Sequence, residues 1–224
     1  MTRREAAIDI AIVVAAIGAG WAITRLALYP ALGIPDYFPA ILRPILGFAA
    51  ACALLYRRGA GWGSLGLRKP ANAWIAIAGA VALYAANWAL SRWALPALAE
   101  LVQPTQQPSF LGYIRGNFEA FALWVAIGWI VGGFMEEMLF RGFLLTRVSQ
   151  LFPDPAAGLA VGVVAQALLF GALHLYAGTF AFLFAAIMAL TSGIFYLILG
   201  RNLWPLIAVH GVWNSVAMWG VYAR

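Results

Sequence analysis

The chain is short of charge, cysteine and lysine. Of its 224 residues, 10% are charged and 64% are hydrophobic, whereas a soluble domain averages about 25% charged and about 45–50% apolar residues. Such a composition leaves too little polar surface to cover a water-facing globule, which excludes a soluble enzyme and a disordered chain. The formal net charge of +6 is therefore interpreted against membrane topology, and no nucleic-acid partner is expected.

The single cysteine, Cys52, has no partner for an intramolecular disulfide, and no zinc motif surrounds it. Arg3 and Arg4 precede a long apolar run, as in a signal peptide, but no small-residue cleavage site with a polar sequence behind it follows. We therefore expect a retained first transmembrane helix. Without repeats or long polar loops, the sequence predicts one integral membrane domain over 1–224, with N-terminal helices and a loop in 1–117 and a motif-bearing catalytic core in 118–224.

The apolar runs predict an all-α, polytopic membrane helix bundle. A bilayer-spanning helix needs about 20 mostly apolar residues, and backbone polar groups must be paired inside the bilayer. The fourth run is too long for a simple span, and the catalytic core is expected in helices four to seven. The seven predicted helices are Ala6–Leu28, Ala40–Tyr56, Ala71–Trp93, Phe118–Leu151, Ala157–Tyr176, Thr179–Leu199 and Leu203–Tyr222.

Basic residues predict the orientation of this bundle in the membrane. With the N-terminus in the cytoplasm, eight basic residues lie inside and five, among them Arg43, lie outside. The segment 57–70 has basic ends and several glycines, which favours a cytoplasmic turn with Trp62 at the headgroups. Lys69 is the only lysine against thirteen arginines, which favours a bacterial source. We expect the protein in the bacterial cytoplasmic membrane.

Ionisable groups inside membrane helices are costly and mark function unless they have a partner. The deep candidates are Asp9, Glu136, Glu137, Arg141, His174 and His210, with Asn87, Gln166 and Asn214 as uncharged polar residues. Glu137 and Arg141 are spaced i,i+4 on one helix face, which favours a structural ion pair. Glu136 lies about 100° around the helix, so it needs another partner and is the better candidate for chemistry.

Two further helices each carry polar groups on one face. Phe170 and His174 are spaced i,i+4, as are His210 and Asn214. Grouping these faces with Glu136 supplies a carboxylate and an imidazole that deprotonate a water, and donors that stabilise an oxyanion. Straight spans would leave the two histidines on levels about 13 Å apart, at 1.5 Å rise per residue. Gly211 would allow close approach of a neighbouring backbone.

The motifs Glu-Glu-x-x-x-Arg at 136–141, Phe-x-x-x-His at 170–174 and His-x-x-x-Asn at 210–214 resemble those of the CPBP family. This family comprises CAAX proteases and bacteriocin-processing enzymes, also called Abi proteins. The loop 62–67 and residues 203–205 are similar to further segments of the family. The resemblance implies an intramembrane glutamate endopeptidase that hydrolyses a peptide bond in a membrane-associated protein or peptide. It assigns catalysis to Glu136, His174, His210 and Asn214, and support of the site to Glu137, Arg141 and Phe170.

Within this resemblance Glu136 and His174 activate the attacking water, and His210 and Asn214 stabilise the oxyanion. No cofactor is expected. The nearest rival is a zinc protease with the same residues, although neither histidine stands at His-Glu-x-x-His spacing. The sequence is also compatible with a proton-coupled transporter and with a non-catalytic membrane scaffold or immunity protein. The eighth helix of many prenyl-protein proteases has no counterpart here, which weakens a specific CAAX assignment.

Overall fold

The computed structural model describes residues 1–32, 38–102 and 109–224, and every regular element in these ranges is a helix. The all-α prediction is confirmed. The α-helices are α1 (Arg3–Ala22), α2 (Tyr29–Leu32), α3 (Phe38–Arg57), α4 (Ala73–Ala89), α5 (Leu95–Val102), α6 (Phe118–Ile127), α7 (Leu145–Ser149), α8 (Pro155–Ala172), α9 (Thr179–Ile198) and α10 (Trp204–Tyr222).

Wider π-helical turns fuse several of these helices into longer runs, at Ile23–Leu28, Leu90–Ala94, Gly128–Glu136 and Met138–Leu144. Short 3-10 helices occupy Trp62–Leu65, Ser109–Ile114 and Leu175–Ala177. Single-turn π-helical deviations frequently occur at functional sites. Here two longer π-helical segments, of nine and seven residues, follow each other across the predicted Glu-Glu-x-x-x-Arg motif.

Five helical runs are long and apolar enough to cross a membrane: Arg3–Ala31, Ala73–Val102, Phe118–Ser149, Pro155–Ala172 and Thr179–Ile198. They correspond to the first, third, fourth, fifth and sixth predicted helices. The second and seventh predictions coincide with α3 and α10, which are helical but are not among the five. In α10, polar His210, Asn214 and Ser215 lower the mean hydropathy. The predicted count of seven spans is therefore not confirmed.

Helix starts follow the local sequence. Thr2 and Glu5 form a reciprocal capping box at the start of α1, which satisfies backbone N–H groups that have no intrahelical partner. The side chains of Asn72, Asn117 and Asp154 accept hydrogen bonds from the first turns of α4, α6 and α8. These polar caps mark where the apolar runs become helical.

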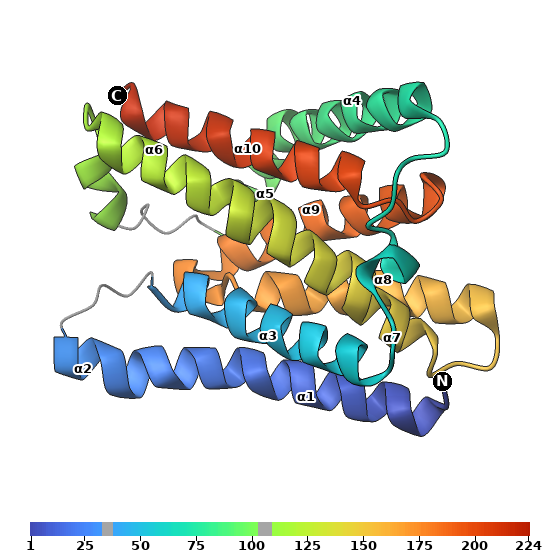
Figure 1. Cartoon of the computed structure of the whole chain (residues 1–224). Coiled ribbons are helices and arrows are strands. Elements are labelled where there is room, and N and C mark those ends of the chain that lie inside the picture. Colours follow the sequence, from blue (N-terminus) through green and yellow to red (C-terminus); the bar gives the residue numbers. More distant parts are fainter. Residues whose placement is uncertain (33–37, 103–108) are drawn as a thin grey trace.

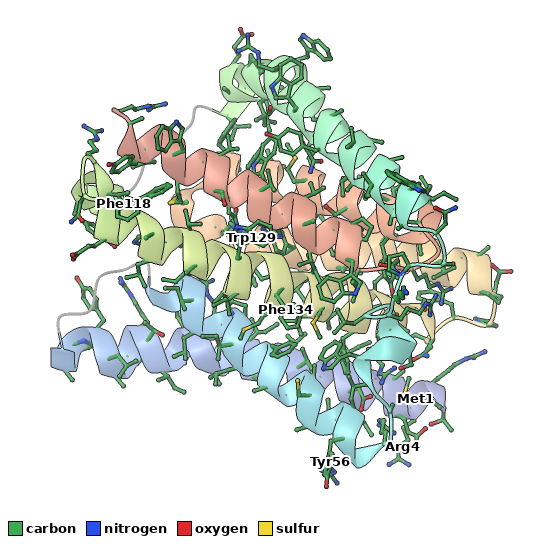
Figure 2. All side chains as sticks on the ribbon, turned by 45° about the horizontal axis from the view of Figure 1, so that its top comes forward. Met1, Arg4, Tyr56, Phe118, Trp129 and Phe134 are labelled. Carbon is green, nitrogen blue, oxygen red and sulfur yellow. The ribbon has the colours of Figure 1, made fainter. Side chains whose placement is uncertain are left out.

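The helices form one bundle of roughly parallel and antiparallel rods, in which α1 packs against α3 and α8 packs against α9 (Figure 1). The π-helical segment Gly128–Glu136 packs against α10, whose other side contacts α4. Trp129, labelled in Figure 2, lies at this junction and donates a hydrogen bond of 3.0 Å from Nε1 to the Ser215 hydroxyl. The Phe118–Ser149 run thus occupies the middle of the bundle, between α3 and α10.

Asp9 of α1 is completely buried and holds two arginines. Its carboxylate accepts a hydrogen bond of 2.6 Å from Nη2 of Arg58 and one of 2.9 Å from Nε of Arg147. Arg58 follows α3 and Arg147 belongs to α7, so one carboxylate ties α1 to two other elements. Arg58 also lies 3.3 Å from Glu5. The partner that Asp9 needs in an apolar helix is therefore a pair of arginines.

The glycine-rich segment after α3 packs inward. Trp62 stacks on Phe48 with ring centroids 5.2 Å apart, and Leu65 is buried. The Tyr196 hydroxyl of α9 donates a hydrogen bond of 2.8 Å to the Leu65 carbonyl. Gly66 has φ of 103°, and a side chain there would clash with the Arg201 carbonyl. Trp62 is half-buried and packs against the core, and its position at the headgroups stays a prediction.

Candidate active site

Glu136 and Glu137 are neighbours in sequence but line two different cavities. Glu136 lines a cavity of about 200 Å³, here called the Glu136 cavity, whose wall comes from α3, the Phe118–Glu136 stretch, the turn after α8, and α10. Glu137 lines a second cavity of about 220 Å³, here called the Asn87 cavity, which lies among α4, α8, α9 and α10. The expectation that Glu136 leaves the face of Glu137 and Arg141 agrees with this arrangement.

Glu137 is the acceptor of a buried charge cluster. Its Oε1 lies 3.0 Å from Nη1 of Arg141, and the two side chains are 1% and 2% exposed. The guanidinium of Arg141 also lies 4.8 Å from the ring centroid of Phe170, a cation–π distance. The ion pair predicted from the i,i+4 spacing is present, and Phe170 packs against it.

His210 joins this cluster from α10. Its Nδ1 lies 2.8 Å from Oε1 of Glu137, and because a carboxylate only accepts hydrogen bonds, Nδ1 carries the proton. The other ring nitrogen, Nε2, lies 3.9 Å from Oε2 of Glu136. His210 therefore bridges the two adjacent glutamates, with a direct hydrogen bond to one and a wider approach to the other. Sequence reasoning missed this contact, because the residues are 73 positions apart.

His174 lies just beyond α8, which ends at Ala172, so the prediction that helix five reaches Tyr176 is wrong. The chain turns there, through a 3-10 helix and Gly178 with φ of 93°. Nδ1 of His174 lies 2.9 Å from the Phe170 carbonyl oxygen, so Nδ1 is the donor. Desolvation lowers the pKa of His174 to about 4, which leaves Nε2 as an acceptor near neutral pH.

The two histidines lie at the same level of the bundle. The Phe170 ring centroid is 4.9 Å from that of His174 and 6.2 Å from that of His210. The offset of about 13 Å that straight spans would give is therefore not present. Exposed residues open α8, whereas Leu203 just before α10 is completely buried and donates its N–H to the Gly66 carbonyl. Because α10 starts deeper in the molecule, His210 reaches the far end of α8.

Glycines of the π-helical segment let α10 approach. The Asn214 amide donates a hydrogen bond of 3.0 Å to the Gly128 carbonyl. A side chain at Gly132 would meet the Asn214 amide nitrogen at 2.5 Å, and one at Gly133 would meet the backbone nitrogen of Gly211 at 3.2 Å. The close approach expected at Gly211 is confirmed. The Asn214 amide keeps a second N–H for another acceptor.

All four residues expected in catalysis meet at the Glu136 cavity, which is lined by Glu136, His174, His210 and Asn214 among others. His174, His210 and Asn214 also line the Asn87 cavity. These three residues therefore form a polar wall between two largely apolar spaces. Glu136 stands on one side of this wall, and the Glu137–Arg141 pair stands on the other.

Arg43 and Tyr176 are additions that the sequence did not indicate. Arg43, expected at an outer helix end, is only 6% exposed. Its guanidinium lies 5.4 Å from the ring centroid of Tyr176, and Tyr176 lines the Glu136 cavity. The sequence feature that could have indicated a role for Arg43 is its position within an apolar run of α3, next to Pro44.

Within the described ranges, no group of three or more His, Cys, Asp and Glu side chains has an arrangement that would hold a metal ion. Glu136, His174 and His210 line a common cavity, but they are not arranged as ligands of one metal ion. His210 is held by Glu137 through Nδ1, and His174 is held by a backbone carbonyl through Nδ1. In each ring Nε2 is therefore the nitrogen that is not used in these Nδ1 hydrogen bonds.

Comparison with known protein families assigns the segment that contains these residues. Residues 118–216 match the model of the type II CAAX prenyl endopeptidases, Rce1-like. This segment is similar to the Rce1-like CAAX proteases. No curated protein and no solved structure gives a significant match to the chain. The resemblance to CAAX proteases inferred from the three motifs is thus confirmed.

The matched segment contains every residue that the motifs assign to the site, from Glu136 to Asn214. The matched segment does not include α1, α3 and α4, yet α3 and α4 complete the cavities. Ile41 of α3 lines the Glu136 cavity, and Asn87 of α4 lines the other. The matched segment and the N-terminal helices therefore build the two cavities together.

Proposed function

We propose that the protein is an intramembrane endopeptidase that hydrolyses a peptide bond in a membrane-associated protein or peptide. The observation that supports it is the meeting of Glu136, His174, His210 and Asn214 at one cavity, although they come from three separate helical regions. Only 10% of the residues are charged, and burying such a cluster is costly. Its presence therefore indicates a function. The match to a family of prenyl endopeptidases agrees with this chemistry.

Glu136 is the proposed general base. Its carboxylate takes a proton from a water molecule, and Nε2 of His174 accepts that water's other hydrogen and orients its lone pair. The water oxygen attacks the carbonyl carbon of the scissile bond. The carboxyl group of Glu136 then passes the proton to the leaving amine nitrogen as the C–N bond breaks. Positioned proton transfer of this kind contributes about 10²–10⁴-fold to a reaction rate.

His210 and Asn214 are the proposed oxyanion donors. An imidazolium at His210 donates through Nδ1 to Glu137 and through Nε2 to the oxyanion. The second N–H of the Asn214 amide supplies another donor, because the first is held by Gly128. Fixed donors of this kind are effective where water is excluded. Glu137 and Arg141 then orient His210, while Phe170 packs between the two rings.

The proposed location is the cytoplasmic membrane of a bacterium, with the N-terminus in the cytoplasm. The five long apolar helical runs support residence in a bilayer, and the excess of arginines near the predicted inner ends supports the orientation. The proposed partners are a membrane-associated protein or peptide substrate and the lipid bilayer. No cofactor is part of the proposed reaction.

Comparative proteomics of membranes tests this function. Cells carrying wild-type protein, Glu136→Gln or Glu119→Gln are compared for protein fragments with new termini. Glu119 is an exposed carboxylate at the start of the same helical run, so the same substitution there is the control. We expect fragments that are present with wild type and Glu119→Gln but absent with Glu136→Gln. A fragment pattern that is identical in all three strains would reject the proposal.

Chelation separates this mechanism from zinc-dependent hydrolysis. Purified protein is treated with a strong chelator, dialysed, and assayed on a substrate identified by the proteomic comparison, while elemental analysis measures bound zinc. A water activated by Glu136 predicts unchanged turnover and no stoichiometric metal. Loss of turnover that returns on addition of zinc would instead support metal activation of the water.

A further inference from the structure

The Asn87 cavity lies directly behind the proposed catalytic wall and has no role in the proposed hydrolytic steps. It shares His174, His210 and Asn214 with the Glu136 cavity. A group bound there would therefore lie next to a peptide bond held at the wall. The cavity volume of about 220 Å³ is several times the roughly 30 Å³ that one water molecule occupies in the liquid, so it has room for a large side chain.

Asn87 is the unusual residue of this cavity. It belongs to α4, an otherwise apolar helix, and is 6% exposed. Its side-chain oxygen is buried without a hydrogen-bond partner among the described residues. A buried acceptor without a partner destabilises the folded protein. An unsatisfied amide in the wall of a cavity therefore indicates a ligand that donates a hydrogen bond at this position.

The remaining walls are largely apolar. Phe184 and Met188 come from α9, and Val209 and Trp213 come from α10. Glu137 and Arg141 also line the cavity and form an ion pair with each other. Within this pair, Oε2 of Glu137 and Nε of Arg141 have no hydrogen-bond partner among the described residues. This combination suits a group with a broad apolar body and one polar tip. A purely apolar group would leave the Asn87 oxygen without a partner, and a charged group would lack a counter-ion.

We propose that the Asn87 cavity binds an aromatic substrate side chain with a hydrogen-bond donor at its tip, tyrosine above all, next to the scissile bond. Asn87 is then a specificity-determining residue that accepts the hydrogen bond of the phenol. This inference rests on the proposed endopeptidase function. Tyrosine fits because it buries a large apolar ring and still needs a polar partner for its hydroxyl.

Peptide kinetics test the proposal on the full-length protein. The probes are membrane-anchored fluorogenic peptides that carry tyrosine or phenylalanine at each position flanking the bond that is cut. A site built around a substrate hydroxyl discriminates strongly against the analogue that lacks it. For wild type we expect kcat/KM to be about tenfold or more higher with tyrosine than with phenylalanine at one position, the difference expected where a buried polar group loses its partner.

The variant Asn87→Leu should abolish or reverse this preference at the same position. Thr191→Val is the control, because it removes a hydroxyl from α9 that does not line the cavity, and it should keep the preference. If cleavage depends on Glu136 but the tyrosine-to-phenylalanine ratio is the same in wild type and Asn87→Leu, the inference is wrong and the proposed function stands. If no peptide is cleaved in a Glu136-dependent manner, the proposed function is wrong.

Direct binding of small aromatic molecules tests the assignment of the Asn87 cavity independently of peptide cleavage. The probes are p-cresol and toluene, which correspond to the tyrosine and phenylalanine side chains, titrated into detergent-solubilised protein with empty micelles subtracted. We expect p-cresol to bind wild type and Glu136→Gln at least about tenfold more tightly than toluene, and Asn87→Leu to lose this difference. Equal binding of the two probes to wild type, or a difference that survives in Asn87→Leu, would overturn the proposal. This measurement also applies if Asn87→Leu cleaves poorly.

Discussion

Nδ1 of His210 lies 2.8 Å from the same Glu137 oxygen that Arg141 approaches at 3.0 Å. One buried carboxylate oxygen thus receives two positively polarised groups from different helices. The neighbouring carboxylate of Glu136 is 3.9 Å from the other nitrogen of His210 and faces a different cavity. The two adjacent glutamates therefore have different surroundings. In the proposed mechanism Glu137 orients His210, and Glu136 is the general base.

The Glu137–Arg141 pair predicts a separation of stability from activity. Glu137→Leu or Arg141→Leu leaves one buried charge without its partner and should destabilise the protein by about 3–5 kcal/mol. The double variant Glu137→Leu/Arg141→Leu removes both charges, so its melting temperature should recover towards wild type. Its turnover should stay low, because His210 has lost the acceptor of its Nδ1 proton. A double variant that recovers full turnover would show that Glu137 does not orient His210.

Gly132 predicts a steric test of the Asn214 position. In Gly132→Ala the new methyl group would lie 2.5 Å from the Asn214 amide nitrogen, so the amide must move. Displacement of a catalytic group by about 1 Å costs on the order of 100-fold in rate, and we expect kcat to fall by about that factor. Gly220→Ala, where no atom lies within 4 Å, is the matched control. Equal rates for the two variants would contradict the assigned position of Asn214.

The Asp9 network predicts that α1 is held by one buried carboxylate. Asp9→Ala leaves Arg147 buried without its partner, and we expect a loss of about 3–5 kcal/mol in stability. Glu5→Ala removes the outer partner of Arg58 and one half of the capping box of α1, and it should lower the melting temperature clearly less than Asp9→Ala does. Thermal unfolding in detergent compares the two variants. Equal melting temperatures for Asp9→Ala and Glu5→Ala would count against the network.

His174 predicts a pH dependence of stability. Its pKa is lowered by desolvation from 6.5 to about 4 in the folded protein. Between pH 6.5 and about pH 4, His174 is protonated in the unfolded chain but neutral in the folded protein. The stability of the folded protein therefore falls as the pH drops from about 6.5 towards 4. His174→Gln lacks this titration. The melting temperature of wild type relative to His174→Gln should decline over that range, whereas parallel curves would show that His174 titrates normally.

The sequence predicted local relationships better than contacts between helices. The Glu137–Arg141 pair follows from helical spacing alone, and the pattern of apolar runs located the helices. The end of α8 was placed too late, because Leu173, Leu175 and Tyr176 continue the run of large hydrophobic residues beyond the helix. The turn that excludes them depends on Gly178 and on backbone hydrogen bonds.

Contacts across the bundle could not be predicted in the same way. The Asp9–Arg147 bond joins residues 138 positions apart, and the common level of His174 and His210 depends on how deep α10 begins. Asn87 was visible as a lone amide in an apolar helix, but its cavity exists only once α4, α9 and α10 have packed. Residue spacing identifies the side chains that share a face of one helix, but it does not identify the neighbouring helix against which that face packs.

Cleavage kinetics of Glu136→Gln test the central claim most directly. Purified wild type, Glu136→Gln and Glu119→Gln are compared on one membrane-anchored peptide, with thermal unfolding to establish that each variant is folded. The account predicts that Glu119→Gln cleaves like wild type, while Glu136→Gln loses at least about 10²-fold in kcat and keeps its melting temperature. A folded Glu136→Gln protein that cleaves the peptide as fast as wild type would contradict the account.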